Sequence, residues 1–151
     1  MTPIQIEKIC HKIILTENLR LKQLDICGGT SLAHIPADIL SNALVRLESI
    51  SLIGTVLTPT QIQKLLLAIA TSRPVRARSL SLLAVDASSV PGNILVAGLA
   101  RLEVVELLDT ILTSHQLAGI FHLVASRQLI YYPHFFPLYY CFFRLFLHYF
   151  L

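Results

Sequence analysis

The 151-residue chain has no tryptophan, one methionine and three cysteines, and only 14% of its residues are charged. With a net charge of +3 and 54% hydrophobic residues, it cannot be a disordered chain or a highly charged nucleic-acid tail. Cys10, Cys27 and Cys141 are too few and too scattered for a closed disulfide set, and no Cys-x-x-Cys pair indicates structural zinc. No apolar run follows basic residues at the N-terminus, so we expect no secretory signal and a reducing, cytoplasmic location.

Aromatic residues are almost missing from the first 130 positions, where Phe121 is the only one. Eleven of the twelve aromatic residues fall between positions 131 and 151, and that segment holds a single charged residue, Arg144. The length allows one domain. We therefore predict two unlike parts, an aliphatic body at residues 1–128 and an aromatic hydrophobic tail at residues 129–151.

The sequence also lacks the usual catalytic motifs. There is no Gly-x-Ser-x-Gly elbow, P-loop, Rossmann glycine set or His-Glu-x-x-His sequence. Gly28-Gly29 follows a predicted strand and is interpreted as a turn, because no Lys-Ser/Thr pair follows it as in a phosphate loop. His115 and His122 are seven residues apart, and two histidines without a third ligand make a poor metal site. We expect a protein that is not an enzyme and that needs neither a metal nor a cofactor.

Within the body, sequence blocks repeat at an offset of 55 residues. The block IPADIL at 35–40 matches VPGNIL at 90–95, and LTPTQI at 57–62 matches LTSHQL at 112–117. The N-terminal block MTPIQIEK at 1–8 matches LTPTQIQK at 57–64 at an offset of 56. Agreement between several blocks indicates an internal repeat.

Each long repeat contains a shorter unit. Four segments of the form L-x-x-L-x-L begin at Leu21, Leu47, Ala77 and Leu102, at spacings of 26, 30 and 25 residues. Their alternation with a period of two predicts strands. The segments between them follow the helical i, i+3, i+4, i+7 rule. Thr58-Pro59-Thr60-Gln61 predicts a helix start, with the threonine as N-cap and the glutamine at N3, and the same pattern recurs near Thr2 and Thr113.

This strand-and-helix unit resembles the leucine-rich repeat family, in particular its ribonuclease-inhibitor-like branch. The blocks LTPTQI and IPADIL are also similar to repeat arrays of intracellular innate-immune receptors of the NACHT type. The resemblance covers about residues 1–128. It implies an α/β solenoid with parallel strands on the concave side and helices on the convex side. One departure is that the position usually held by Asn or Cys reads Gly29, Thr55, Val85 and Thr110, which reduces the expected side-chain ladder under the turns.

In such an array, the strand residues that point away from the core form an ordered surface. A shallow sheet suits a protein surface better than a small substrate. The resemblance therefore implies a protein-binding module with an unidentified partner, in the manner of the sensor or regulatory part of an immune-type receptor. The candidate binding residues are Gln23, Asp25, Cys27, Ser49, Ser51, Ile53, Ser79, Ser81, Leu83, Val104, Glu106 and Leu108.

Charged residues repeat just before each strand. Arg20, Arg46, Arg76 and Arg101 hold one position, and Lys22, Glu48, Arg78 and Glu103 hold the position two residues later. The simpler interpretation is a solvated strand entrance at which Glu48 and Glu103 are the partners of the arginines. The alternative is a contact site for an acidic partner, strongest around Arg73, Arg76 and Arg78.

The tail allows three interpretations. Residues 135–151 reach the lower length limit of a membrane span, which would make the chain a tail-anchored repeat protein. The tail could instead pack as a cap on the last repeat, or be foreign to the array, as after a frameshift or a retained intron. We expect membrane contact through the tail only. Because Met1 aligns with the middle of a repeat unit, we also expect a piece of a longer array, able to self-associate through uncapped ends.

Overall fold

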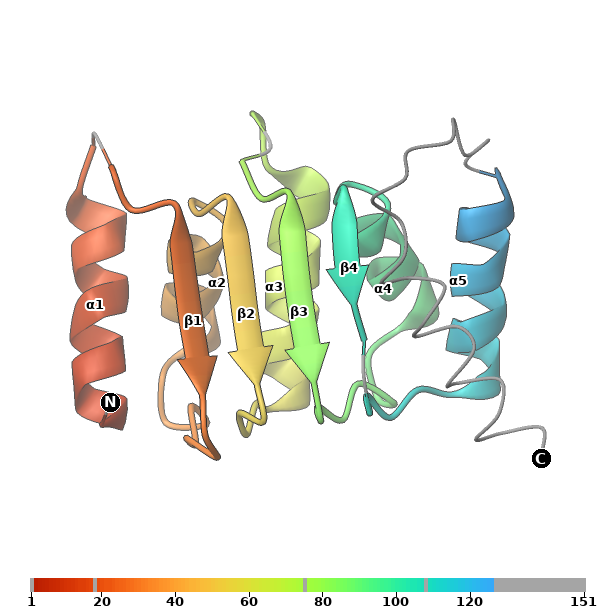
Figure 1. Ribbon diagram of the computed structural model, residues 1–151, viewed down its shortest axis with the longest axis horizontal. Coiled ribbons are helices and arrows are strands. Elements are labelled where there is room, and N and C mark those ends of the chain that lie inside the picture. Colours follow the sequence, from red (N-terminus) through yellow and green to blue (C-terminus); the bar gives the residue numbers. More distant parts are fainter. Residues whose placement is uncertain (1, 18, 75, 108, 127–151) are drawn as a thin grey trace.

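Helices and strands alternate along the whole described part of the chain. The computed structural model describes residues 2–17, 19–74, 76–107 and 109–126. The elements are α1 (Pro3–Leu15), β1 (Gln23–Cys27), α2 (Ala37–Leu44), β2 (Ser49–Ile53), α3 (Pro59–Thr71), β3 (Ser79–Leu83), α4 (Gly92–Leu99), β4 (Val104–Glu106) and α5 (Ser114–Ser126), as Figure 1 shows.

The four strands form one parallel sheet in the order β1-β2-β3-β4. Their register pairs Leu24 with Ile50, Ile50 with Leu80, and Leu80 with Val105. Each of these residues is the fourth of its L-x-x-L-x-L segment, so equivalent positions of the sequence repeat lie side by side. The prediction that the four segments run parallel as neighbours is confirmed, and so is the α/β class.

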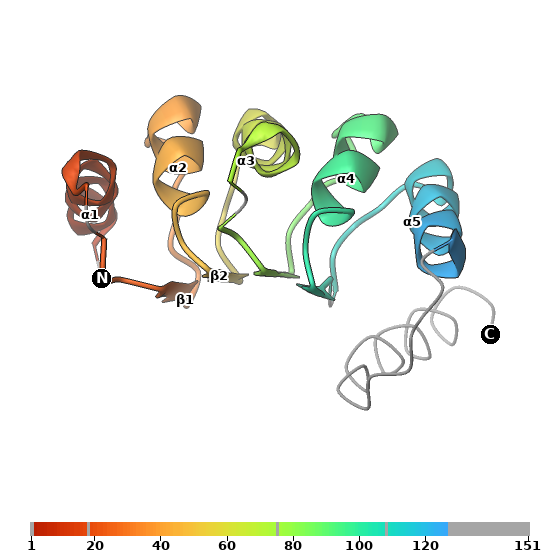
Figure 2. The same ribbon diagram turned by 90° about the horizontal axis from the view of Figure 1, so that it is seen from above.

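The five described helices, α1 to α5, all lie on one face of the sheet (Figure 2). The strands β1, β2 and β3 alternate between exposed or half-buried residues and buried ones, as in β1, where Leu24 and Ile26 are buried, whereas the shorter β4 has one exposed and two half-buried residues. The buried strand residues meet helix residues such as Leu40, Leu65 and Leu95 in one continuous aliphatic core. Neighbouring helices also contact one another along the row. Since no described helix covers the opposite face, the other half of the strand residues faces outward there.

The predicted helix starts are confirmed. Thr2 and Thr58 cap α1 and α3, and in each case the glutamine at N3 accepts the N–H of the cap residue. The pair Thr113 and Gln116 makes the same two hydrogen bonds at the start of α5. Capping of this kind is worth about 1 kcal/mol per helix.

Two of these glutamines do more than cap. Gln61 is 2% exposed, and its Nε2 donates to the carbonyl oxygens of Leu32 and Ile35 at 2.7 Å each. Gln116 repeats this arrangement with the carbonyls of Ala87 and Val90, at 2.8 and 2.6 Å. The amide group thus ties each helix to the loop of the preceding strand-helix unit.

The turns after the strands use glycine where the backbone requires it. Gly28 and Gly29 have φ angles of 89° and 70°, a region that favours glycine, which agrees with the prediction of a turn. Beneath the later turns, Thr110 Oγ1 donates to the carbonyl of Leu82 at 2.6 Å. The equivalent Thr55 Oγ1 is buried and has no hydrogen-bond partner among the described residues. Of the two threonines at this position, only Thr110 makes the hydrogen bond, so the side-chain ladder among the described residues has one such bond.

Among the residues that the structure describes, no helix has both the length and the apolar character needed to cross a bilayer. Residues 129–151 lie outside the described residues, so the three interpretations of the tail stay predictions.

Candidate functional site

The outward side chains of β1 to β4, called here the strand face, stand in three rows across the sheet. Eleven of the twelve residues predicted from the sequence lie in these rows, and Leu108 lies outside the described residues. The register sets the membership of each row. The first row holds Gln23, Ser49, Ser79 and Val104; the second holds Asp25, Ser51, Ser81 and Glu106; the third holds Cys27, Ile53 and Leu83.

Hydrogen bonds within and between the rows hold several polar side chains in place. Gln23 Nε2 donates to the two carboxylate oxygens of Asp25, at 3.0 and 2.8 Å. Ser79 Oγ donates to Ser49 Oγ at 2.8 Å, and the hydroxyl of Ser81 donates to the carboxylate of Glu106. The middle of the face therefore consists of small polar groups with one acid at each end.

The third row is apolar. Ile53 is 42% exposed, and Leu83 beside it is half-buried. Cys27 completes the row at β1 and is exposed. The face therefore changes along the strands from polar and acidic groups to an aliphatic strip at their C-terminal ends.

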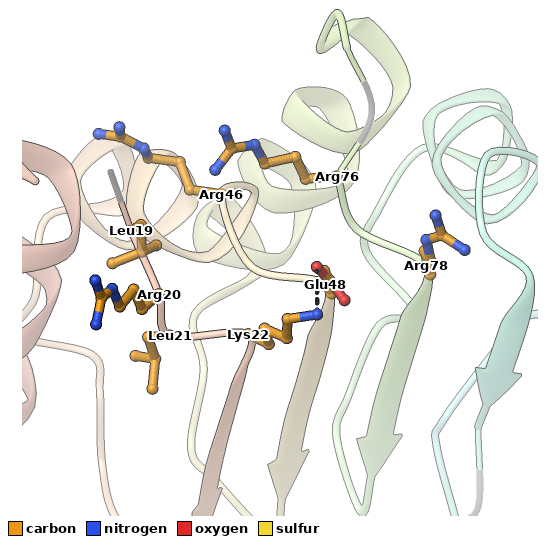
Figure 3. A pocket seen from close by; sticks show the side chains of 8 residues that line it. All are labelled: Leu19, Arg20, Leu21, Lys22, Arg46, Glu48, Arg76 and Arg78. Atoms are coloured by element: carbon orange, nitrogen blue, oxygen red, sulfur yellow. Dashed lines mark ion pairs between the residues drawn. The ribbon is translucent and has the colours of Figure 1, made fainter. Parts of the chain in front are cut away.

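A shallow cavity of about 380 Å³ lies at the other end of the strands, where β1, β2 and β3 begin. We call it the edge pocket. Figure 3 shows Arg46 and Arg76 at its upper rim, with Arg20 and Arg78 on opposite sides. It is lined by Leu19, Arg20, Leu21, Lys22, Arg46, Glu48, Arg76 and Arg78.

The ion pairs at this edge differ from the expected ones. Glu48 lies 3.5 Å from Lys22 Nζ, and Glu103 lies 3.5 Å from Arg78 Nη1. The expectation that these acids are the partners of the arginine row Arg20, Arg46, Arg76 and Arg101 is therefore wrong. In-register pairing explains this, since Glu48 N–H donates to Lys22 O and Glu103 N–H donates to Arg78 O. These residues are direct neighbours, whereas the arginines lie two residues earlier.

Arg46 has a structural role that sequence reasoning missed. Its guanidinium donates to the carbonyl oxygens of Ile14 and Thr16, and the bond to Thr16 is 3.0 Å long. These carbonyls lie at the C-terminal end of α1, where the last turn of a helix leaves acceptors unpaired and favours a cation. The sequence gives no sign of this contact across 30 residues.

The three arginines predicted to meet an acidic partner are not all brought together. Arg76 and Arg78 line the edge pocket, whereas Arg73, which follows α3, does not. Arg20 and Lys22, which precede β1 two units earlier in the chain, lie there instead. Their equivalence to Arg76 and Arg78 in the repeat was the signal that could have located them.

The two cysteines within the described residues differ in burial: Cys10 is buried and Cys27 is exposed. Burial raises the pKa of the Cys10 thiol to about 11, with a further contribution from Glu7, so this thiol stays protonated at neutral pH.

No group of three or more His, Cys, Asp or Glu residues that could hold a metal ion occurs in the described segments.

Comparisons with protein-family models, with curated proteins and with solved structures find no match to this chain. The strand face and the edge pocket are therefore the features from which a function can be inferred.

Proposed function

We propose that the chain is a leucine-rich repeat array that acts as a non-enzymatic protein-binding module through its strand face. The observation that carries the proposal is the register of the repeat, which aligns equivalent outward residues in rows on a face that no described helix covers. Burying polar and apolar side chains in fixed rows is how a flat surface recognises another protein.

The size of the strand face limits the partner. Three strands of five residues and one of three, at about 3.3 Å per residue and about 4.8 Å between strands, give a face of roughly 300 Å². A standard interface uses about 800 Å² per partner. The strand face therefore fits a single helix or extended segment of a partner better than the flat side of a whole domain.

The chemistry of the rows indicates what that segment carries. Asp25 and Glu106 attract cationic groups, while Ile53 and Leu83 favour apolar ones. We propose a partner segment with basic residues beside an aliphatic or aromatic residue. The further proposal that the module belongs to the sensing or regulatory part of an immune-type receptor rests on the resemblance of its repeats to NACHT-type receptors.

Ser51 gives the sharpest test. It is half-buried in the centre of the face, between Asp25 and Ser81, and its hydroxyl has no hydrogen bond among the described residues. Ser51→Arg places a long cation there without breaking an existing bond. We expect it to abolish capture of proteins that crosslink to the wild-type chain, as measured by affinity capture with quantitative mass spectrometry.

The matched control is Leu67→Arg on α3, where the side chain is 46% exposed on the helix side. It adds the same charge away from the strand face and is expected to leave capture unchanged. Circular dichroism checks that both variants keep their helices. Equal capture by wild type and Ser51→Arg would refute the use of this face.

A further inference from the structure

We infer that the edge pocket binds a compact anion that carries several phosphate groups. This pocket lies at the entrance to the strands and not on the strand face, so anion binding there does not depend on the proposed function.

The edge pocket carries a high positive charge. Five cationic side chains and one carboxylate line it, a net charge of +4, which exceeds the +3 of the entire chain. The positive charge of the protein is therefore concentrated at this edge. The remainder of the chain carries a net charge of only −1, so the field at this edge attracts an anion.

Few of the cations that line the edge pocket are neutralised by carboxylates of the described residues. Glu48 is held by Lys22, and Glu103 is held by Arg78, both at 3.5 Å between largely exposed side chains. Such pairs contribute little and exchange readily. No described carboxylate lies within ion-pair distance of Arg20 or Arg76, so two guanidinium groups are open to a ligand.

The arrangement of the repeat explains why several cations line one pocket. The parallel register brings Lys22, Glu48 and Arg78 into one row, because Glu48 N–H donates to Lys22 O and Arg78 N–H donates to Glu48 O. Arg20, Arg46 and Arg76, two positions earlier in each unit, line the same pocket. Like charges around one cavity repel one another, and a bound polyanion offsets that repulsion.

The choice of phosphate rests on the residues that line the edge pocket. The planar guanidinium fork matches phosphate oxygens in bidentate geometry, and four of the five cations are arginines. A cavity of about 380 Å³ lies at the lower end of the range for small-molecule sites. Leu19 and Leu21 give it an apolar wall. The cations surround one cavity rather than forming a long stripe, which favours a compact anion over nucleic acid.

The test is isothermal titration of the full chain with inorganic triphosphate, with orthophosphate and hexaglutamate as comparisons. We expect triphosphate to bind most tightly. Arg20→Gln and Arg76→Gln should each weaken it about tenfold or more, because each removes charge-assisted hydrogen bonds. Neither side chain makes a hydrogen bond or ion pair with another described residue, so unfolding temperature and circular dichroism should not change.

Arg101→Gln is the matched control, since Arg101 occupies the same position before β4 but does not line the pocket. It removes the same charge from the chain and should leave the affinity for triphosphate almost unchanged. An equal loss with Arg101→Gln and Arg76→Gln would mean that net charge alone attracts the anion, and would overturn the inference. Hexaglutamate binding as tightly as triphosphate would overturn it as well, in favour of an acidic protein segment.

Vesicles distinguish the two sources of such an anion. Phosphatidylcholine vesicles with and without a bisphosphorylated phosphoinositide are cosedimented with wild type and with Arg76→Gln. Vesicle binding that requires the phosphoinositide and is lost in Arg76→Gln supports anion binding in the edge pocket and identifies a lipid headgroup as the ligand. Binding of triphosphate without binding of vesicles supports anion binding in the edge pocket and identifies a free anion as the ligand. Binding to neither refutes it.

Discussion

The buried amide of Gln61 provides the most direct test of how the units are held together. Its Oε1 accepts the N–H of Thr58 at 2.8 Å, and its Nε2 donates to the carbonyls of Leu32 and Ile35. Gln5 occupies the equivalent position of α1. It makes the same capping bond to Thr2 at 2.8 Å, but its side chain is exposed and makes no bond to a preceding loop in the described residues.

This pair separates capping from the tie between units. Gln5→Ala loses only the capping interaction, about 0.5–1 kcal/mol. Gln61→Ala loses that and also leaves buried carbonyl oxygens without their donor, at about 1–3 kcal/mol. Leu32 O keeps a bond from the N–H of Ile35, so most of this penalty falls on Ile35 O. The expected total for Gln61→Ala is about 3 kcal/mol.

Equilibrium unfolding in urea, followed by circular dichroism, measures both variants. We expect the free energy of unfolding to fall about 2 kcal/mol further in Gln61→Ala than in Gln5→Ala, with an unchanged slope against denaturant. Gln61→Glu should be worse than Gln61→Ala, because it points a carboxylate at two carbonyls. Losses for Gln61→Ala and Gln5→Ala that agree within about 0.5 kcal/mol would refute the reasoning, since the buried bonds would then contribute nothing.

Two further outcomes follow from buried groups. Thr55→Val should leave the free energy of unfolding unchanged or raise it, because it removes a buried hydroxyl that has no partner among the described residues. Thr110→Val should lower the free energy of unfolding by about 1 kcal/mol, because the carbonyl of Leu82 loses its hydrogen bond from the threonine. Equal effects of the two variants in urea unfolding would contradict this. The pKa of Cys10 is raised to about 11, so the folded state favours the neutral thiol: its contribution to stability is complete below the ordinary value of 9.0 and is lost as pH rises through about 11. Iodoacetamide at pH 8 should therefore label Cys27 well before Cys10, as peptide mass spectrometry can show, and equal labelling would count against burial of that thiol.

The sheet could be predicted because its signal is local and repeated. Leu24 and Ile26 alternate with polar residues, and the same alternation recurs in each unit, so register follows from alignment of the sequence with itself. The capping pattern at Thr58 and Gln61 likewise lies within four residues. These features depend on neighbours in the chain, which a single sequence displays.

The contacts of long side chains could not be predicted in the same way. Glu48 and Glu103 were expected to pair with the arginines of the preceding row, but the register makes Lys22 and Arg78 their nearest cations. Arg46 reaches the end of α1, a contact that depends on how helix and strand pack. The second role of Gln61 also needs the loop at Ile35 in place before its acceptor exists.

The register of the sheet thus positions both the edge pocket and the strand face, and the two surfaces bind through different interactions. The edge pocket begins at Arg20 and Lys22, and the strand face begins one residue later at Gln23. About three residues, roughly 10 Å, separate Lys22 from Asp25 along β1, close to the Debye length at physiological salt. A polyanion in the pocket therefore acts on the acidic row only weakly. At the strand face salt weakens only the attraction of basic groups to Asp25 and Glu106 and leaves the apolar contacts of Ile53 and Leu83 intact, whereas anion binding at the edge depends on charge throughout and weakens more steeply as salt rises. Salt dependence accordingly separates a ligand of the edge pocket from a partner of the strand face before any residue is changed.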